Sequence, residues 1–260
     1  MPTVEENKGA WDGSYDWSQA GNEWSVGWGG PRMQWYGFIL PRLQAFVPAT
    51  RILEIGCGYG RWTQFLKDLG QDLTVVDLAE RCVAACQERF AASSHLHYAV
   101  TDGRSLKMIP DASVDLVFSF DSLVHADANA LGGYISELPR ILRPQGAAFL
   151  HHSNLGACPF YLWLERRQRL AQRLKRLRLV EPHLHWRDGS VSAALVEQMA
   201  SRAGLRCISQ EVLNWRTRRA LIDCISVLVP PDSIHARQMR RKRNRRVAAD
   251  MRRLEGLAHL

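Results

Sequence analysis

Three glycines alternate with other residues in a short stretch that is suited to holding a small ligand by its backbone. The stretch reads Leu53-Glu54-Ile55-Gly56-Cys57-Gly58-Tyr59-Gly60-Arg61-Trp62. Because glycine has no Cβ, the chain can turn tightly there and approach a ligand closely. Asp77 ends an apolar run 17 residues beyond Gly60, where its carboxylate can accept hydrogen bonds from both hydroxyls of a ribose. Together these residues predict an adenosine-like ligand.

The spacing of the glycines argues against a dinucleotide. A dinucleotide fingerprint requires Gly-x-Gly-x-x-Gly and a pyrophosphate at the N-terminus of the following helix. Here the third glycine comes one place early, and Arg61 occupies the required position. Glu54, two residues before Gly56, would repel a pyrophosphate but suits a cationic amino group.

The elements that must position these residues alternate between strand and helix. We expect five strands with helices between them, at residues 51–55, 73–77, 96–100, 114–120 and 146–151. A helix over 192–203 and strands over 205–213 and 222–229 follow. Such an alternation is typical of a parallel sheet covered on both faces. We therefore predict an α/β, Rossmann-like domain over residues 46–230, with a seven-stranded, mostly parallel sheet.

Two further segments flank or interrupt this domain. Residues 1–45 hold five of the nine tryptophans, which predicts an ordered aromatic lid; a segment that only pads the core is the alternative. Residues 161–180 have apolar side chains along one helical face and arginines around the rest. We interpret them as an amphipathic helix, inserted after strand five over about 160–185, that caps the active site; pairing with a second subunit or lying on a membrane are alternatives.

The last 30 residues form a basic tail, residues 231–260. Nine Lys and Arg against three acidic residues give this tail a charge of 9 − 3 = +6, out of +8 for the whole chain. We expect a solvated helical or disordered tail, with binding to RNA or to an anionic membrane as the alternative.

The composition of the sequence argues against several classes of protein. The sequence has no run of 18 apolar residues that would span a membrane, and its first residues lack a secretion signal. Six cysteines without a Cys-x-x-Cys pair argue against a structural zinc site and a disulfide scaffold. These features predict a cytoplasmic protein.

The glycine stretch resembles motif I of the class I S-adenosylmethionine-dependent methyltransferases. The other family motifs follow in order over about residues 46–230: Val76-Asp77-Leu78, Thr101-Asp102-Gly103, Phe118-Ser119-Phe120-Asp121 and Leu138-Pro139-Arg140-Ile141-Leu142-Arg143-Pro144-Gln145-Gly146. The resemblance implies S-adenosylmethionine as methyl donor. It also implies that Gly56, Gly58 and Gly60 line the methionine and ribose, and that Asp77 holds the ribose.

The same resemblance implies the contacts of the adenine and methionine ends. Leu78 would pack on adenine, Asp102 would accept a hydrogen bond from its amino group, and Gly103 would stay small beside it. Phe120 and Asp121 would close the methionine side. For Leu78 and Phe120, plain core packing is an equal alternative.

Methyl transfer to a hydroxyl needs an in-line geometry and a base that removes the proton. His125 follows strand four and is the expected base, with His152 at the end of strand five as a second candidate. Asp121, which precedes His125 at the end of strand four, is the third candidate catalytic residue. A loop histidine with a local hydrogen bond is the alternative for His125. Asp121, His125 and Asp127 could also bind a divalent cation, but such clusters more often serve hydrogen bonding, and no metal is predicted.

The absence of certain motifs excludes some classes of methyl acceptor. Amino-directed nucleic-acid enzymes carry Asn/Asp-Pro-Pro-aromatic where this chain has Phe120-Asp121-Ser122-Leu123, and cytosine C5 enzymes need Pro-Cys where Cys158-Pro159 has the reverse order. Oxygen or carbon acceptors on small or glycan-like molecules remain. Three segments resemble sugar or polysaccharide methyltransferases: Tyr15-Asp16-Trp17 with Gly21-Asn22-Glu23-Trp24-Ser25, His151-His152-Ser153-Asn154, and Asp223-Cys224-Ile225-Ser226.

The function predicted from the sequence is therefore O-methylation of a sugar or related hydroxyl compound, with a histidine as general base. The alternatives are an RNA or natural-product methyltransferase, and a nucleic-acid-binding protein that uses the basic tail.

Overall fold

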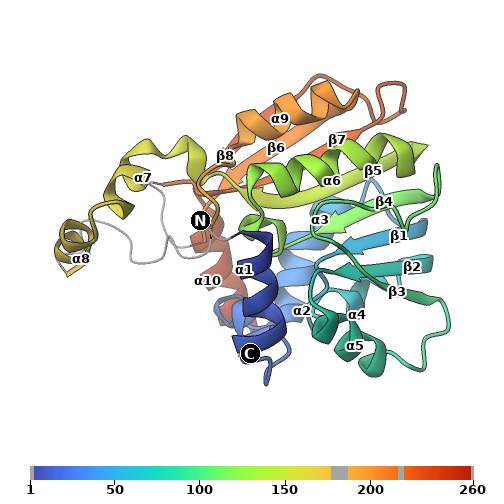
Figure 1. The fold of residues 1–260 in the computed structure, drawn as a ribbon, viewed down its shortest axis with the longest axis horizontal. Helices are drawn as coiled ribbons and strands as arrows, with labels where there is room; N and C mark the ends of the chain where they lie inside the picture. Colours follow the sequence, from blue (N-terminus) through green and yellow to red (C-terminus); the bar gives the residue numbers. More distant parts are fainter. Residues whose placement is uncertain (1–2, 177–186, 216–219, 259–260) are drawn as a thin grey trace.

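One twisted sheet forms the centre of the molecule (Figure 1). The computed structural model describes residues 3–176, 187–215 and 220–258. The strands in this part of the chain are β1 (Ala49–Ile55), β2 (Gly70–Asp77), β3 (Leu96–Val100), β4 (Val114–Ser119), β5 (Leu142–Ser153), β6 (Arg206–Leu213), β7 (Asp223–Val229) and β8 (Arg240–Asn244). Their order is β3-β2-β1-β4-β5-β7-β6-β8, and β7 runs antiparallel to β5 and β6 while the other pairs are parallel. The predicted Rossmann-like fold class is confirmed.

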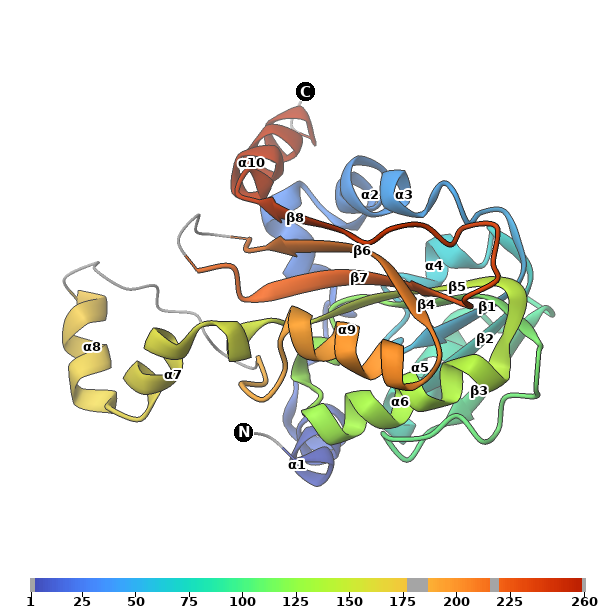
Figure 2. The ribbon, with the colours of Figure 1, turned by 90° about the horizontal axis from the view of Figure 1, so that it is seen from above.

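Helices cover both faces of this sheet, because alternate strand residues point to opposite sides. Val117 of β4 belongs to the core beneath α6 (Ala128–Ile141) and α9 (Ala193–Arg202). Its neighbour Phe118 belongs to the opposite core. That core is covered by α2 (Pro31–Gln34), α3 (Leu40–Leu43), α4 (Thr63–Leu66), α5 (Glu80–Arg89) and α10 (Val247–Ala258). Figure 2 shows α6 and α9 on one side of the sheet and α2, α3 and α10 on the other.

The sheet has eight strands, which corrects the prediction of seven. The additional strand β8 comes from the basic tail and pairs in parallel with β6. Side-chain contacts explain why a run of arginines is held there. Arg241 donates to Gln210 (2.8 Å) and to Glu197 (2.6 Å), and Asn244 donates to Glu211 (2.5 Å). The expected helical or disordered tail is therefore wrong for these residues, which form a strand, although residues 240–243 remain exposed to solvent.

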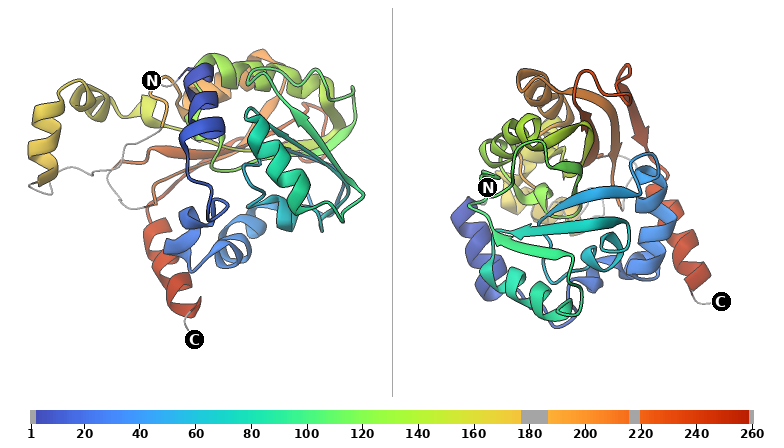
Figure 3. Two further views of the ribbon diagram at one scale, coloured as in Figure 1. Left: turned by 60° about the horizontal axis from the view of Figure 1, so that its bottom comes forward. Right: turned by 90° about the vertical axis from the view of Figure 1, so that its right-hand side faces the viewer.

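The end of the tail packs on the N-terminal segment, where α10 lies beside η2 (Asn22–Trp28) and α2 (Figure 3). A Cβ added to Gly37 would lie 2.6 Å from the side chain of Leu254, and one added to Gly29 would lie 2.4 Å from Ala258. Glycines in the first segment thus create the groove that α10 fills.

Short helical turns make up the N-terminal segment. They are α1 (Val4–Gly9), η1 (Ala10–Ser14), η2 (Asn22–Trp28), α2 and η3 (Trp35–Ile39). Thr3 and Glu6 form a capping box that starts α1. Residues at the start of this segment lie over the carboxyl ends of the parallel strands, where Asn7 donates to the carbonyl oxygen of His125 (3.0 Å).

The segment after β5 forms two helices rather than one, α7 (Pro159–Glu165) and α8 (Gln168–Arg176). The last part of the predicted helix, residues 177–180, lies outside the described residues. Figures 1 and 2 both show α7 and α8 projecting from the body. Neither helix contributes a residue to the two pockets at the carboxyl ends of the strands, so the prediction that they cap this region is wrong for the described residues. No described helix is long and apolar enough to cross a membrane.

Candidate active site

Two adjoining pockets lie at the carboxyl ends of β1, β2 and β4. Their empty volumes are about 480 and 540 Å³, within the range of small-molecule sites. The residues that line both are Trp11, Gly56, Asp77, Ser122 and His125. They therefore form the junction of one site with two chambers, which we call the first pocket (about 480 Å³) and the second pocket (about 540 Å³).

The glycine loop forms the floor of this junction. Gly56 and Gly58 have φ values of +79° and +52°, a region that disfavours other residues. A Cβ on Gly56 would come 1.8 Å from the Ser122 Oγ, and a Cβ on Gly58 would come 2.8 Å from the ring of Trp17. The bare backbone is thus needed at both positions. Gly60 lines neither pocket. It has a φ of +83°, and a Cβ added to it would lie 2.5 Å from the ring of Phe90.

The carboxylate of Asp77 is held in place at the end of β2. One oxygen accepts from the backbone N–H of Gly58 (2.9 Å), and the other accepts from that of Ala79 (3.0 Å). Burial raises the pKa of Asp77, although these backbone N–H donors act to lower it. Each oxygen keeps a further lone pair, so Asp77 can still accept hydrogen bonds from a ligand.

The second pocket is lined on one side by Leu78, Thr101 and Gly103 and on the other by α1. Gly103 has a φ of +79°, and a Cβ there would lie 2.8 Å from Val4. The adjacent Asp102 faces its own turn instead: its carboxylate accepts from the backbone N–H groups of Arg104 (2.8 Å) and Ser105 (2.6 Å). It lines neither pocket.

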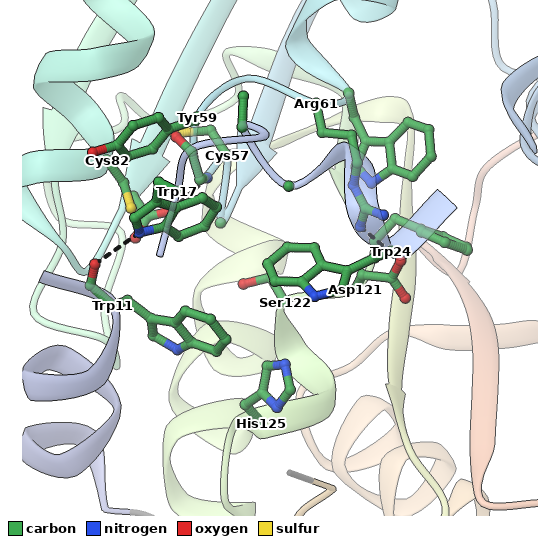
Figure 4. Close-up of a pocket in the computed structure, with 17 residues that line it drawn as sticks. Trp11, Trp17, Trp24, Cys57, Tyr59, Arg61, Cys82, Asp121, Ser122 and His125 are labelled. Atoms are coloured by element: carbon green, nitrogen blue, oxygen red, sulfur yellow. Dashed lines mark hydrogen bonds and ion pairs between the residues drawn. The ribbon is translucent and has the colours of Figure 1, made fainter. Parts of the chain in front are cut away.

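Aromatic rings from the N-terminal segment form the walls of the first pocket. Figure 4 shows Trp11, Trp17 and Trp24 around it, with His125 below them. The Trp17 indole donates to the carbonyl oxygen of Trp11 (3.0 Å), and its ring stacks on Tyr59 with centroids 4.7 Å apart. These contacts fix the rings, so the walls are preorganised.

His125 lies between the two pockets at the end of η4 (Leu123–His125). Its ring centroid is 5.2 Å from that of Trp11. Asp127 is the N-cap of α6, and its side chain accepts from the backbone N–H of Ala130 (2.7 Å). Among the described residues no group of three or more His, Cys, Asp or Glu side chains is placed to hold a metal ion.

A buried chain of alternating charges starts at the first pocket, and the sequence did not predict it. It runs from Arg61 to Asp121 (2.7 Å), on to His151 (3.1 Å) and then to Asp223 (3.8 Å). Arg187 closes the chain with a two-pronged contact to Asp223 (2.7 and 3.1 Å). The short contacts among Arg61, Asp121 and His151, and between Arg187 and Asp223, hold these side chains in fixed orientations.

The charges in this chain shift one another's pKa values. Burial acts to raise the pKa of Asp121, but Arg61 and His151 hold it well below its ordinary value. Burial acts to lower the pKa of His151, but Asp121 and Asp223 raise it above its ordinary value. The His151 Nδ1 lies 3.1 Å from both the backbone nitrogen and the Oδ1 of Asp121, so it accepts from the N–H when neutral and donates to the carboxylate when charged. The raised pKa favours the second arrangement.

His152 points to the other face of β5, away from both pockets. It is fully buried, with one ring nitrogen 2.8 Å from the Ser153 carbonyl oxygen and the other 2.8 Å from the Ser226 Oγ. Burial lowers its pKa to about 4. The alternation of a strand would have distinguished the two histidines, because His151 shares a face with Phe149, whereas His152 shares one with Leu150.

Glu54 lies behind the glycine loop and lines neither pocket. Its Oε2 accepts from the Thr63 hydroxyl (2.6 Å), while its Oε1 has no hydrogen-bond partner among the described residues. Burial raises the pKa of Glu54 to about 8.

The structure thus brings eight of the sequence-predicted site residues to the pockets: Gly56, Gly58, Asp77, Leu78, Gly103, Phe120, Asp121 and His125. The four that line neither pocket are Glu54, Gly60, Asp102 and His152.

Comparison with known proteins finds a family match over part of the chain. Residues 52–146 match the family model described as a methyltransferase domain. The chain is 33% identical over 99 residues to malonyl-[acyl-carrier protein] O-methyltransferase of Serratia marcescens, covering 38% of this chain and 36% of that protein. It is 31% identical over 100 residues to nodulation protein S of Sinorhizobium fredii, covering 38% and 45%. The matched region spans less than half of each relative.

The fold is also shared with a solved structure. An S-adenosylmethionine-dependent methyltransferase from Clostridium acetobutylicum has a TM-score of 0.55 and 12% identity, over 76% of this chain and 91% of that one. At this identity the likeness concerns the fold.

Proposed function

Because the chain carries a class I methyltransferase domain, we propose that it transfers a methyl group from S-adenosylmethionine to a hydroxyl of a sugar or related small molecule. The observation that carries the proposal is the position of Asp77. Its fixed carboxylate borders both pockets beside the bare backbone of Gly56 and Gly58. The residues present fit such a donor, because Gly56 and Gly58 line the pocket without a side chain and ribose hydroxyls can donate to Asp77.

The second pocket would hold the nucleoside of the donor, with Asp77 on the ribose and Leu78 and Gly103 beside the adenine. Phe120 and Asp121 would face the methionine side from the first pocket. When bound, S-adenosylmethionine supplies an electrophilic methyl group on a positively charged sulfur.

His125 is the residue that we propose as general base. It lies at the junction of the two pockets, where the end of the donor site meets the remaining space. A neutral imidazole can accept the proton of a hydroxyl as the oxygen forms its new bond to carbon. His152 is not placed for this step, because both of its ring nitrogens have partners in a buried position.

Asp121 is a positioning residue in this proposal rather than a second base. One of its oxygens is engaged by Arg61 and the other by His151, and its low pKa makes it a poor proton acceptor. The ion pair presents a fixed polar edge in a pocket that is also lined by the aromatic rings of Trp11, Trp17 and Trp24. Flat aromatic faces beside a few fixed polar groups suit a sugar ring, which supports the acceptor class.

A product screen with labelled S-adenosylmethionine tests this proposal. Nucleotide sugars, oligosaccharides and RNA are offered separately, each with and without Mg²⁺ and a chelator. We expect label in a sugar fraction. Label in RNA alone would overturn the acceptor class, and failure to bind either S-adenosylmethionine or S-adenosylhomocysteine in calorimetry would overturn the whole proposal.

A further inference from the structure

In the described part of the chain, the projecting pair of helices α7 and α8 packs on the body through α7. Tyr161 and Leu162 pack against the small cluster that includes Leu155 and Ile222. Beyond this point Figures 1 and 2 show α8 well separated from the sheet. The outer surface of the pair therefore needs an explanation that the fold does not supply.

Large apolar side chains lie exposed on this pair. Phe160 is 52% exposed and Trp163 is 43% exposed, and their rings stack with centroids 6.0 Å apart. Leu170 on α8 is 36% exposed. A water-exposed aromatic pair with a neighbouring leucine costs solvation free energy unless another surface covers it.

Basic side chains surround these apolar residues. The exposed arginines of the pair are Arg166, Arg167, Arg169, Arg173 and Arg176, and residues 166–176 contain no Asp or Glu. On α8, Arg169 and Arg173 are one turn apart, next to Leu170 and Leu174, which are also one turn apart. The Arg167 guanidinium lies 4.3 Å from the centre of the Trp163 ring. Basic and apolar stripes thus run side by side.

We propose that α7 and α8 dock onto the surface of an anionic lipid bilayer. Such a surface matches both stripes, because its lipid headgroups attract arginine while its interface accepts Trp, Phe and Leu. A second copy of the chain fits less well, because symmetric pairing would bring the arginines of two copies together. A nucleic acid would satisfy the arginines but leave Leu170 and Leu174 without an apolar partner.

The place of these helices in the chain indicates which side of the molecule would face the bilayer. α7 follows β5 through η5 (Leu155–Ala157), and His151 of β5 contacts the pocket residue Asp121. A bilayer bound to α7 and α8 therefore lies on the side of the molecule where β5 ends. The inference concerns a surface and stands whether or not the acceptor is a sugar.

Cosedimentation of the full chain with lipid vesicles tests the proposal. We expect binding to phosphatidylcholine vesicles that contain phosphatidylglycerol, no binding to phosphatidylcholine alone, and weaker binding as salt rises. The double variants Phe160→Ser/Trp163→Ser and Arg169→Glu/Arg173→Glu should each reduce the affinity roughly tenfold or more. Calorimetric binding of S-adenosylhomocysteine verifies that each variant is folded.

The charge-matched control is Arg237→Glu/Arg240→Glu, which alters two exposed arginines of the basic tail. Vesicle binding should persist in this control. Loss of binding in the control but not in the α8 variant would overturn the proposal, as would equal binding by all variants. Two other outcomes would also overturn it, if they depend on the same α7 and α8 residues. One is self-association without lipid binding, and the other is RNA binding in place of vesicle binding.

Discussion

Arg61 and Asp121 form a buried ion pair, with 2.7 Å between the Nη2 and Oδ2 atoms, that joins the glycine loop to the end of β4. Asp121 has a φ of +61°, a conformation that is costly for a residue with a side chain. The pair therefore holds the wall of the first pocket in a shape that the backbone would not adopt alone.

Removing one partner of this pair should destabilise the protein strongly. Asp121→Asn leaves the Arg61 guanidinium buried without its carboxylate, which we expect to cost about 3 kcal/mol of unfolding free energy. The double variant Arg61→Gln/Asp121→Asn should recover part of that loss. Denaturant unfolding of the wild type, the two single variants and the double variant measures the coupling free energy between Arg61 and Asp121. Additive effects of the single variants would show that the ion pair contributes nothing to stability.

Asp77→Ala should abolish most of the donor affinity. The variant loses the proposed ribose contact and two hydrogen bonds that fix the loop, so we expect S-adenosylhomocysteine to bind at least about tenfold more weakly. Asp102→Ala is the matched control, because the Asp102 carboxylate faces its own turn. Calorimetry that ranks the two variants in the reverse order would contradict this reading of the second pocket.

His125→Ala should lose turnover while keeping donor affinity. General-base catalysis contributes about a hundredfold to ten-thousandfold, so we expect a loss in kcat of that order. His152→Gln should keep activity per folded molecule but lower the melting temperature, because it disturbs buried hydrogen bonds. Near-normal kcat in His125→Ala would remove this residue from the mechanism.

Glu54 should make the folded protein less stable as the pH rises. Burial raises its pKa to about 8, so between pH 4.5 and about 8 the unfolded chain releases a proton that the folded chain keeps. The unfolding free energy of the wild type should therefore fall through this window relative to that of Glu54→Gln, which does not titrate. Melting curves across the window measure the difference, with Glu88→Gln on the exposed face of α5 as control; parallel curves for Glu54→Gln and wild type would contradict the expectation.

Leu254→Ala should destabilise the protein although it lies in the tail. Its side chain occupies the space left by Gly37, and truncation would open a gap there, at a cost of about 2 kcal/mol. Leu257→Ala, at an exposed position of the same helix, should have little effect. Equal melting temperatures for the two variants would mean that α10 does not hold the N-terminal segment.

Local sequence patterns were sufficient to predict much of the fold. β3 coincides with the predicted 96–100, and β4 begins at the predicted Val114, because these short apolar runs are bounded by turn residues. The glycine loop and Asp77 could be placed because their roles depend on backbone conformation and position at a strand end. The helix expected between the first two strands is only the short α4, since the chain follows the loop turns up to Trp62 before it becomes helical.

Long-range contacts account for what the sequence did not predict. Nothing near Arg241 indicates that Gln210 and Glu197 will accept its hydrogen bonds, so the run of arginines was interpreted as solvated. The partners of His151, Asp121 and Asp223, lie 30 and 72 residues away in the chain (151 − 121 and 223 − 151), which hid the buried charge chain. The projection of α7 and α8 likewise depends on tertiary placement rather than on amphipathic pattern.

The composition of β8 has a consequence for solubility. β8 is the last strand of the sheet, and one side of its backbone has no neighbouring strand in the described chain. An open edge of this kind invites strands of other molecules to add to it and so to build aggregates. Because β8 reads Arg-Arg-Lys-Arg-Asn, any identical edge that approached it would meet a row of like charges, and this edge of the sheet is thereby guarded against adding a strand from another molecule.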